Sequence, residues 1–137
     1  MIEVIPVDRE HLVAYFYKIG RYHLQKCMPY TDEYTLSDIS NELLAGRLQL
    51  WAVVEEEKPV ATFTTAVVEF PRKKVLECIH LGGERLDEWA STALKVLDVY
   101  AAQEGCTEVV TIGRKATEKL YKKLGFEFDS VKMVRKI

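Results

Sequence analysis

The sequence predicts an α+β fold in which a mixed, mostly antiparallel sheet carries helices on both faces. Three runs rich in β-forming residues follow one another between positions 48 and 80 with only short turns between them. Such a succession is typical of an antiparallel meander. A long helical pattern then separates the third run from a further β-run at 108–112. This strand–helix–strand crossover makes its two strands parallel. The predicted order is β-α-α-β-β-β-α-β-α-β.

Composition places the chain among ordinary globular proteins. The 137 residues, 48% apolar and 29% charged, suit one domain over 1–137 with a substantial core. A net charge of −2 gives no electrostatic attraction to nucleic acid or to an anionic membrane, so we expect neither as a partner. No apolar run approaches the ~20 residues of a membrane span. The N-terminus lacks the basic-then-apolar order of a signal peptide.

The three cysteines, Cys27, Cys78 and Cys106, are far apart and show no metal-ligand spacing. We therefore expect no metal site. Dispersed cysteines in odd number indicate reduced thiols and a cytoplasmic location. A nucleophilic cysteine needs a site that stabilises the thiolate, and the sequence offers no sign of one.

The N-terminal elements are a strand and a helix. The strand covers 2–7, and its proline favours an edge or a strand end. Asp8 is a good N-cap. Gly20 ends or interrupts the helix that follows. Apolar residues recur in this helix at helical spacing: Leu12, Tyr15, Phe16 and Ile19.

Residues 21–34 have no clear pattern, and Pro29 excludes one unbroken helix through them. The segment either lines a cleft or packs as a loop. It carries several aromatic and soft side chains: Tyr22, His23, Met28, Tyr30 and Tyr34. Thr35 or Ser37 then caps a helix that ends at Gly46.

The three strands of the meander are predicted at 48–55, 60–70 and 75–80. The third breaks at Gly82 and Gly83, after which a four-turn amphipathic helix runs to Gly105. Free amides and the dipole at a helix start, next to glycines, can bind phosphate groups. The same glycines can also serve only as a tight turn, and the sequence leaves both readings open. Trp51 and Trp89 are expected in the core.

The last third contains a strand at 108–112, a helix over 114–124 stopped by Gly125, and a closing strand at 126–134. The helix and its stop carry the segment Leu120-Tyr121-Lys122-Lys123-Leu124-Gly125-Phe126. Together with the element order, this segment resembles the GNAT family of acyl-CoA-dependent N-acyltransferases, whose final helix carries a pattern like A-x-x-L-Y-x-x-x-G-F. Here the alanine, Ala116, stands one residue early. The compact form is similar to GNAT-like proteins of bacteriophages.

The resemblance implies a binding site for acetyl-CoA as co-substrate. The strand at 75–80, with Ile79 and Leu81, would pair with the pantetheine, and the amides at Gly82 and Gly83 would receive the pyrophosphate. The family's loop reads R/Q-x-x-G-x-G/A, whereas this chain has Leu81-Gly82-Gly83-Glu84-Arg85. The basic entry is missing and an acidic residue is present. Arg85 or Arg114 could supply the lacking charge, because a guanidinium grips phosphate in two places.

The resemblance also directs the choice of catalytic residues. Tyr121 could protonate the leaving thiolate of the thioester, or it could be an amphipathic core tyrosine. Glu69, Glu77 and His80 are candidates for the base that deprotonates the amine. Strand alternation puts Glu77 on the face of Ile79 and puts His80 on the opposite face. A glutamate in an apolar strand can have a raised pKa.

Two functions follow. The first is an N-acetyltransferase that moves an acetyl group from acetyl-CoA to an amine of a small molecule, peptide or protein. The second is a non-catalytic GNAT-fold protein with a degenerate CoA loop, which binds a partner or builds a larger structure such as a viral one. A homodimer that buries 21–34 or the last strand would suit the second.

Overall fold

A computed structural model describes residues 1–137 and contains one five-stranded sheet in the order β1-β2-β3-β4-β5. The strands are β1 (Ile2–Pro6), β2 (Gln49–Glu55), β3 (Lys58–Glu69), β4 (Lys74–Gly83) and β5 (Glu108–Thr111). Every pair is antiparallel except β4 and β5, which are parallel because α4 crosses over between them. The predicted mixed sheet, with its meander and its crossover, is confirmed.

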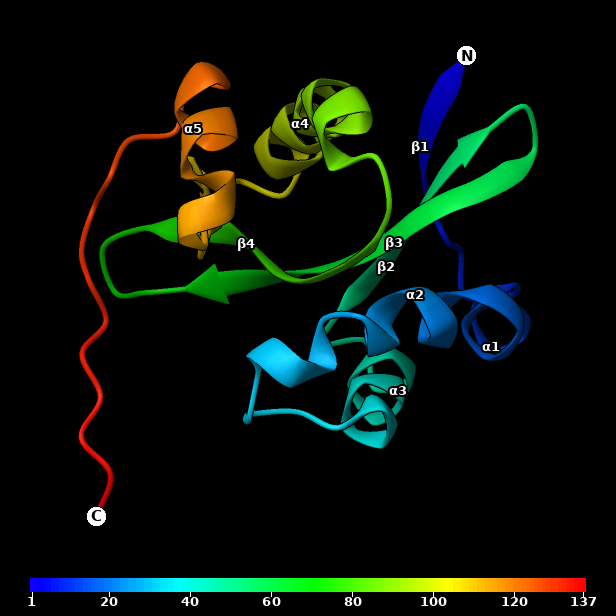
Figure 1. Cartoon of the computed structure of the whole chain (residues 1–137), viewed down its shortest axis with the longest axis horizontal. Helices are drawn as coiled ribbons and strands as arrows, with labels where there is room; N and C mark the ends of the chain where they lie inside the picture. Colours follow the sequence, from blue (N-terminus) through cyan, green and yellow to red (C-terminus); the bar gives the residue numbers. More distant parts are fainter.

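Helices cover both faces of the sheet, as Figure 1 shows. The first group is α1 (Leu12–Tyr15), a π-helical turn (Phe16–Gly20), α2 (Arg21–Gln25), a 3-10 turn (Met28–Tyr30) and α3 (Leu36–Leu44). The second group is α4 (Leu86–Gln103) and α5 (Lys115–Lys123), on the other side of the sheet. None of these helices combines the length and the apolar character that crossing a membrane would need.

The core between the sheet and α4 is built around three stacked aromatic rings. Phe63 of β3 lies between Trp51 of β2 and Trp89 of α4, with ring centroids 5.9 and 5.8 Å apart and planes 6° from parallel. Both tryptophans are almost fully buried, which confirms them as core residues. Each indole N–H is also satisfied, since Trp51 Nε1 donates to Thr65 Oγ1 and Trp89 Nε1 to the carbonyl of Glu84.

The helical segment from α1 to α2 continues through Gly20, so the prediction that this glycine ends or interrupts the helix is wrong. Gly20 is buried, and a β-carbon there would lie at ordinary contact distance from Thr62 and Leu50. Packing against the sheet therefore overrides the weak helix propensity of glycine. The expected cap of α3 is confirmed, because Thr35 forms a reciprocal pair with Asp38. The prediction that Asp8 is the N-cap of the first helix is wrong. Asp8 accepts the amide hydrogen of His11 and closes the turn before α1, whereas the N-cap residue of α1 is His11.

Strand β4 is longer than predicted. Gly82 and Gly83 do not form the turn but continue the strand, opposite Thr62 and Ala61 of β3. The chain reverses at the next residues, where Arg85 adopts a left-handed φ of 62°. A side chain at Gly82 would run into the His23 carbonyl of α2. Close packing therefore requires the glycine here, and the turn itself does not.

No strand forms at 126–134, and this prediction is wrong for the single chain. After Gly125 the backbone continues in an extended path away from the sheet (Figure 1). No backbone group between 127 and 137 takes part in a backbone hydrogen bond. Strand-forming residues make a strand only when a neighbouring edge accepts them, and the single chain brings none alongside.

Candidate functional site

Strands β4 and β5 run together over four residue pairs and then separate. The last pair is Cys78 with Thr111. Beyond it β4 continues to Gly83 but has a neighbour only on the β3 side. From Ile79 onward, the backbone groups on the β5 side of β4 therefore face no strand. Such an unpaired edge can accept an extended ligand through main-chain hydrogen bonds.

An apolar groove lies beside this open edge, between α4 and α5. Twelve of its 13 lining residues are hydrophobic. They are Phe63, Cys78, Leu81, Leu86, Trp89, Ala90, Ala93, Leu94, Leu97, Thr111, Tyr121, Leu124 and Phe126. The groove runs from the end of β4 to the first turns of α4, and α5 contributes the phenol. This composition suits the apolar part of a ligand, with few polar groups to orient it.

Tyr121 stands in the wall of this groove. Its ring packs against Phe126 at 5.5 Å between centroids and against Gly113, where a β-carbon would come within 3.0 Å of the ring. Burial raises the pKa of the Tyr121 phenol, and a hydrogen bond from Thr111 partly offsets this rise. The phenol therefore keeps its proton at neutral pH and can act as a proton donor.

His80 lies on the face of the sheet opposite to Tyr121, because the β3–β4 register shifts between Phe63 and Thr65. This irregularity places His80 against Tyr34, with ring centroids 4.6 Å apart, in the layer of the N-terminal helices. Alternation along the strand predicted that His80 lies on the face opposite to Ile79. Because both side chains lie in the layer of the N-terminal helices, that prediction is wrong. Alternation fails because one strand carries an extra residue at the bulge.

His80 is 3% exposed, and its imidazole has one hydrogen-bond partner. Its Nδ1 lies 2.8 Å from Thr64 Oγ1, and its Nε2 has no hydrogen-bond partner. Burial lowers the pKa of His80 to about 4, so the ring is neutral at pH 7. Nε2 has a free lone pair only if Nδ1 carries the proton and donates it to Thr64; in the other tautomer Nε2 is a donor.

The two candidate glutamates differ in their place on the sheet. Glu69 is the last residue of β3 and pairs with Lys74, at the end of β4 remote from the open edge. Glu77 pairs with Val110 of β5, one residue before the strands separate, and is half-buried. Of the three proposed bases, Glu77 and His80 therefore lie next to the point of separation, and Glu69 does not.

The connection between β4 and α4 is acidic, and its charged side chains form ion pairs. Arg85 donates to both carboxylate oxygens of Glu55, at 3.1 Å each, and to Glu88 at 2.8 and 3.1 Å. Glu84 lies 3.5 Å from the ammonium of Lys26. The guanidinium predicted to receive phosphate thus already serves two carboxylates.

Arg114 is differently placed. It is the N-cap of α5, and its guanidinium lies over the ring of Tyr30, 3.9 Å from the centroid. No carboxylate forms an ion pair with Arg114 among the salt bridges of the structure. Of the two arginines predicted for the phosphates, Arg114 is therefore the one whose charge is free.

Comparison with known proteins relates this arrangement to one fold. No protein-family model and no curated protein matches the sequence. Solved structures match over almost the whole chain. An aminoglycoside acetyltransferase from an uncultured soil metagenomic sample, solved with sisomicin, has a TM-score of 0.69 and 13% identity over 99% of this chain and 96% of its own. The chain has the GNAT fold.

Two further GNAT structures support this. The aminoglycoside N-acetyltransferase AAC(6')-Iy in complex with CoA matches with a TM-score of 0.71 and 16% identity, covering 99% of this chain and 95% of its own. Glucosamine-6-phosphate N-acetyltransferase from Arabidopsis thaliana matches with a TM-score of 0.67 and 15% identity, covering 99% and 98%. At sequence identities this low, the structural likeness establishes the fold and nothing further.

Several side chains of this GNAT-fold site escaped the sequence analysis. Thr64 holds His80 through its hydroxyl and also accepts the His80 amide hydrogen at 3.2 Å. Nothing in the run of threonines in β3 distinguishes it. The stacking of Arg114 on Tyr30 joins positions far apart in the sequence. Cys78, which lines the groove, keeps its proton at neutral pH, because burial raises the pKa of the Cys78 thiol to about 12.

Proposed function

We propose that this protein is an N-acetyltransferase that moves the acetyl group of acetyl-CoA to an amine. The observation that carries the proposal is the open edge of β4 beyond Cys78, beside an apolar groove that has Tyr121 in its wall. An extended amide-containing arm with apolar stretches fits such an edge and groove. AAC(6')-Iy, a structure of the same fold, was solved with CoA.

In this proposal, the backbone of Ile79 and Leu81 pairs with the pantetheine arm. The phosphates lie toward the end of β4 and the first turn of α4, near the Gly82 and Gly83 amides. Arg114 contributes an unpaired positive charge, and Arg85 contributes only after release from its carboxylates. Close approach of backbone and ligand is compatible with the two glycines.

The chemistry is an acyl transfer between two sides of the sheet. The amine lone pair attacks the thioester carbonyl, a C–N bond forms, the C–S bond breaks, and the sulfur departs as a thiolate. The phenol of Tyr121 gives its proton to that sulfur. Glu77 or His80 takes the proton of the amine, directly or through water. Glu77 and His80 lie on the sheet face opposite to Tyr121. In this proposal, acetyl-CoA and the amine therefore enter from opposite sides of the sheet.

His80 and Glu77 each have one property that suits the role of general base. His80 is neutral, but a pKa of about 4 makes it a weak base at neutral pH. Glu77 is half-buried beside the point of separation. Glu69 stays in the proposal only as the remote alternative.

The acceptor is an amine of a small molecule, a peptide or a protein. In this proposal the segment 21–34 faces the acceptor, since Tyr34 packs against His80 and Tyr30 lies under the Arg114 guanidinium. Structures of the same fold include aminoglycoside acetyltransferases and a glucosamine-6-phosphate N-acetyltransferase. Their acceptors show the range of amines that this fold serves.

Titration calorimetry with acetyl-CoA tests the proposal directly. We expect saturable one-to-one binding, and binding of CoA alone with similar affinity because the acetyl group is a small part of the ligand. Absence of heat and of any thermal stabilisation at millimolar acetyl-CoA would refute it.

A second candidate, a non-catalytic GNAT-fold protein, draws support from one observation. The β4–α4 connection brings four carboxylates near the expected phosphate site: Glu55, Glu84, Asp87 and Glu88. Negative charge at a helix N-terminus competes with a bound anion. A folded protein that binds a partner but not CoA would establish this alternative. The cytoplasmic location, the single domain, the bacteriophage resemblance and the homodimer remain predictions.

A further inference from the structure

The hydroxyl group of Thr64 has only His80 as a hydrogen-bond partner. Thr64 is fully buried in β3, and its oxygen contacts two atoms of His80, the backbone amide nitrogen at 3.2 Å and the ring Nδ1 at 2.8 Å. A hydroxyl group has one hydrogen to donate and two lone pairs with which to accept. The His80 amide can only donate, so it takes one of these lone pairs.

The contact with Nδ1 decides which ring nitrogen of His80 carries the proton. Burial lowers the pKa of His80 to about 4, so the ring is neutral at pH 7 and has one N–H. If Nδ1 carried it, His80 would fill both lone pairs of Thr64, and the hydroxyl hydrogen would be buried without an acceptor. If Nε2 carries it, Thr64 donates its hydrogen to Nδ1 and is fully satisfied. A buried donor without a partner costs free energy, which favours the proton on Nε2.

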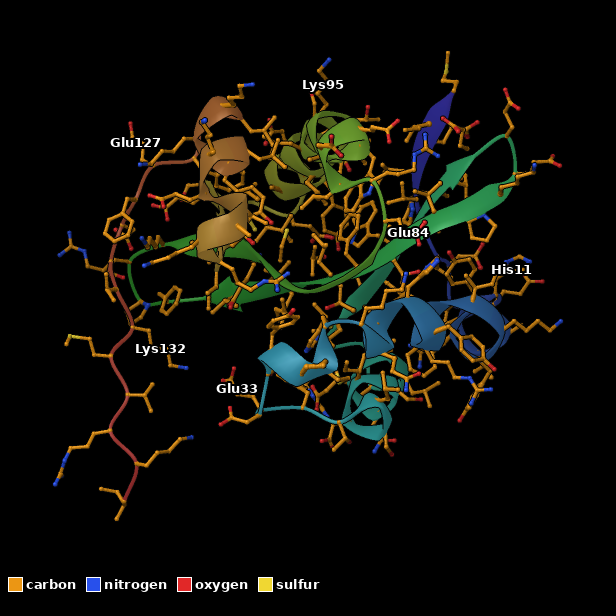
Figure 2. All side chains as sticks on the ribbon, in the orientation of Figure 1. His11, Glu33, Glu84, Lys95, Glu127 and Lys132 are labelled. Atoms are coloured by element: carbon orange, nitrogen blue, oxygen red, sulfur yellow. The ribbon has the colours of Figure 1, made fainter.

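The Nε2–H group points away from β3. The two nitrogens of an imidazole ring diverge, and Nδ1 faces Thr64 of β3. Beyond Cys78, the side of β4 remote from β3 is the open edge. The half-buried Tyr34 packs edge-on against the imidazole, with ring planes 86° apart. It belongs to the same irregular segment as Glu33, which Figure 2 labels. The N–H therefore lies beside the open edge, next to the segment that faces the acceptor.

We propose that Thr64 holds the ring proton of His80 on Nε2, and that His80 donates this hydrogen to an oxygen atom of the bound substrates. The inference rests on the acetyl transfer proposed above. A neutral ring with its proton on Nε2 cannot take the amine's proton there, and Nδ1 already accepts from Thr64. The role of base then falls to Glu77, and Thr64 is a positioning residue.

The oxygen atom comes from one of two sources. The first is the thioester carbonyl, on which negative charge develops as the amine attacks. The second is a hydroxyl or carbonyl group of the acceptor, close to its amine. Either oxygen accepts a hydrogen bond from an N–H group, whereas an alkylamine brings no such oxygen. A site with a buried donor discriminates against a substrate that leaves this donor unpaired.

Nitrogen-15 NMR of the imidazole rings tests the tautomer in the protein without ligands. In long-range proton–nitrogen spectra at pH 7, we expect the His80 ring to show a protonated Nε2 and an unprotonated Nδ1. A wild-type ring with its proton on Nδ1, or divided equally between the two nitrogens, would overturn the proposal. This measurement needs no variant.

Variants of Thr64 test its role as the positioning residue. Thr64→Val removes the hydroxyl and keeps the shape, so the His80 ring should become a mixture of tautomers, and Thr64→Ser should restore the wild-type pattern. Thr62→Val is the matched control, because Thr62 is equally buried and contacts Nδ1 of His23 at 2.8 Å. It should leave the His80 signals in place. A single Nε2–H tautomer in folded Thr64→Val would overturn the role of Thr64.

Substitution of His80 separates a hydrogen-bond donor from a base. The side-chain amide of glutamine reaches the position of Nε2 and donates there but takes up no proton, whereas the shorter asparagine does not reach it. We therefore expect kcat/KM of His80→Gln to exceed that of His80→Asn by at least about tenfold. Equal losses in the two folded variants would overturn the donor role.

A pair of amines identifies the oxygen. Ethanolamine carries a hydroxyl where propylamine carries a methyl group. A preference for ethanolamine that His80→Asn abolishes would assign the oxygen to the acceptor. Equal kcat/KM for the two amines, together with the higher activity of His80→Gln, would assign it to the thioester carbonyl. Absence of acetyl transfer to any amine would refute the proposed function and with it the donor role, while the tautomer is decided by NMR alone.

Discussion

The carbonyl oxygen of His23 occupies the space that a side chain on Gly82 would need. Helix α2 is thereby packed directly onto the end of β4, at the edge that we assign to the cofactor. The glycine that resembles part of a phosphate loop is required for packing whether or not a ligand binds.

Gly82→Ala should therefore destabilise the fold strongly. Because the obstacle is backbone and not a flexible side chain, we expect a loss of about 3 kcal/mol or more in the free energy of unfolding. Gly20→Ala is the matched control, since its β-carbon would meet neighbours only at ordinary contact distances, 3.6 Å and beyond. It should be neutral or stabilise by about 1 kcal/mol. Equal effects in urea denaturation would contradict this account.

Tyr121→Phe should separate chemistry from binding. Loss of the proton donor should lower kcat by about a hundredfold, while acetyl-CoA affinity and thermal stability stay close to wild type because the ring is retained. Leu120→Ala on the same helix is a control for general damage to α5. Steady-state kinetics with a thiol-detecting assay would measure kcat of both variants. Unchanged turnover would remove the phenol from the mechanism.

The paired state of Arg85 predicts an unusual gain of function. In Glu55→Gln with Glu88→Gln, the guanidinium loses both ionised partners and the start of α4 loses a negative charge. We expect acetyl-CoA to bind about tenfold more tightly, measured by calorimetry at low salt. Stability should change little, since these ion pairs are exposed. Unaltered affinity would show that phosphates do not approach this loop.

Arg114→Ala should have the opposite effect. Its unpaired guanidinium over Tyr30 is the free positive charge of the site, so we expect weaker acetyl-CoA binding by several fold at low salt, with a smaller difference at high salt. Lys95→Ala, at an exposed position on α4 shown in Figure 2, changes the net charge equally and is the control. Equal responses of the two variants would exclude a specific role for Arg114.

His80 gives the fold a dependence on pH with a defined sign. Burial lowers the pKa of His80 from 6.5 to about 4, so between these values the unfolded chain binds more protons than the folded one. The free energy of unfolding therefore falls as the pH drops from 6.5 toward 4. His80→Asn should flatten that fall in urea titrations. His11→Asn should not, because Asp8 raises the pKa of His11 and its contribution has the opposite sign.

The order of the elements could be predicted from the sequence because each pattern is local. Strand runs, caps such as Thr35 with Asp38, and the amphipathic period of α4 depend on neighbours within a few residues. The resemblance carried by Leu120, Tyr121, Gly125 and Phe126 added the fold. These features sufficed for the sheet, for the crossover and for tryptophans in the core.

Tertiary structure alone decided the details of the site. The bulge that turns His80 toward Tyr34 depends on register between two strands, and alternation within one strand cannot reveal it. Gly82 is required by a helix some sixty residues earlier in the chain, and Arg85 is occupied by Glu55 of β2. The strand predicted at 126–134 does not form for a related reason. Strand propensity is local, but a strand exists only where another chain segment pairs with it.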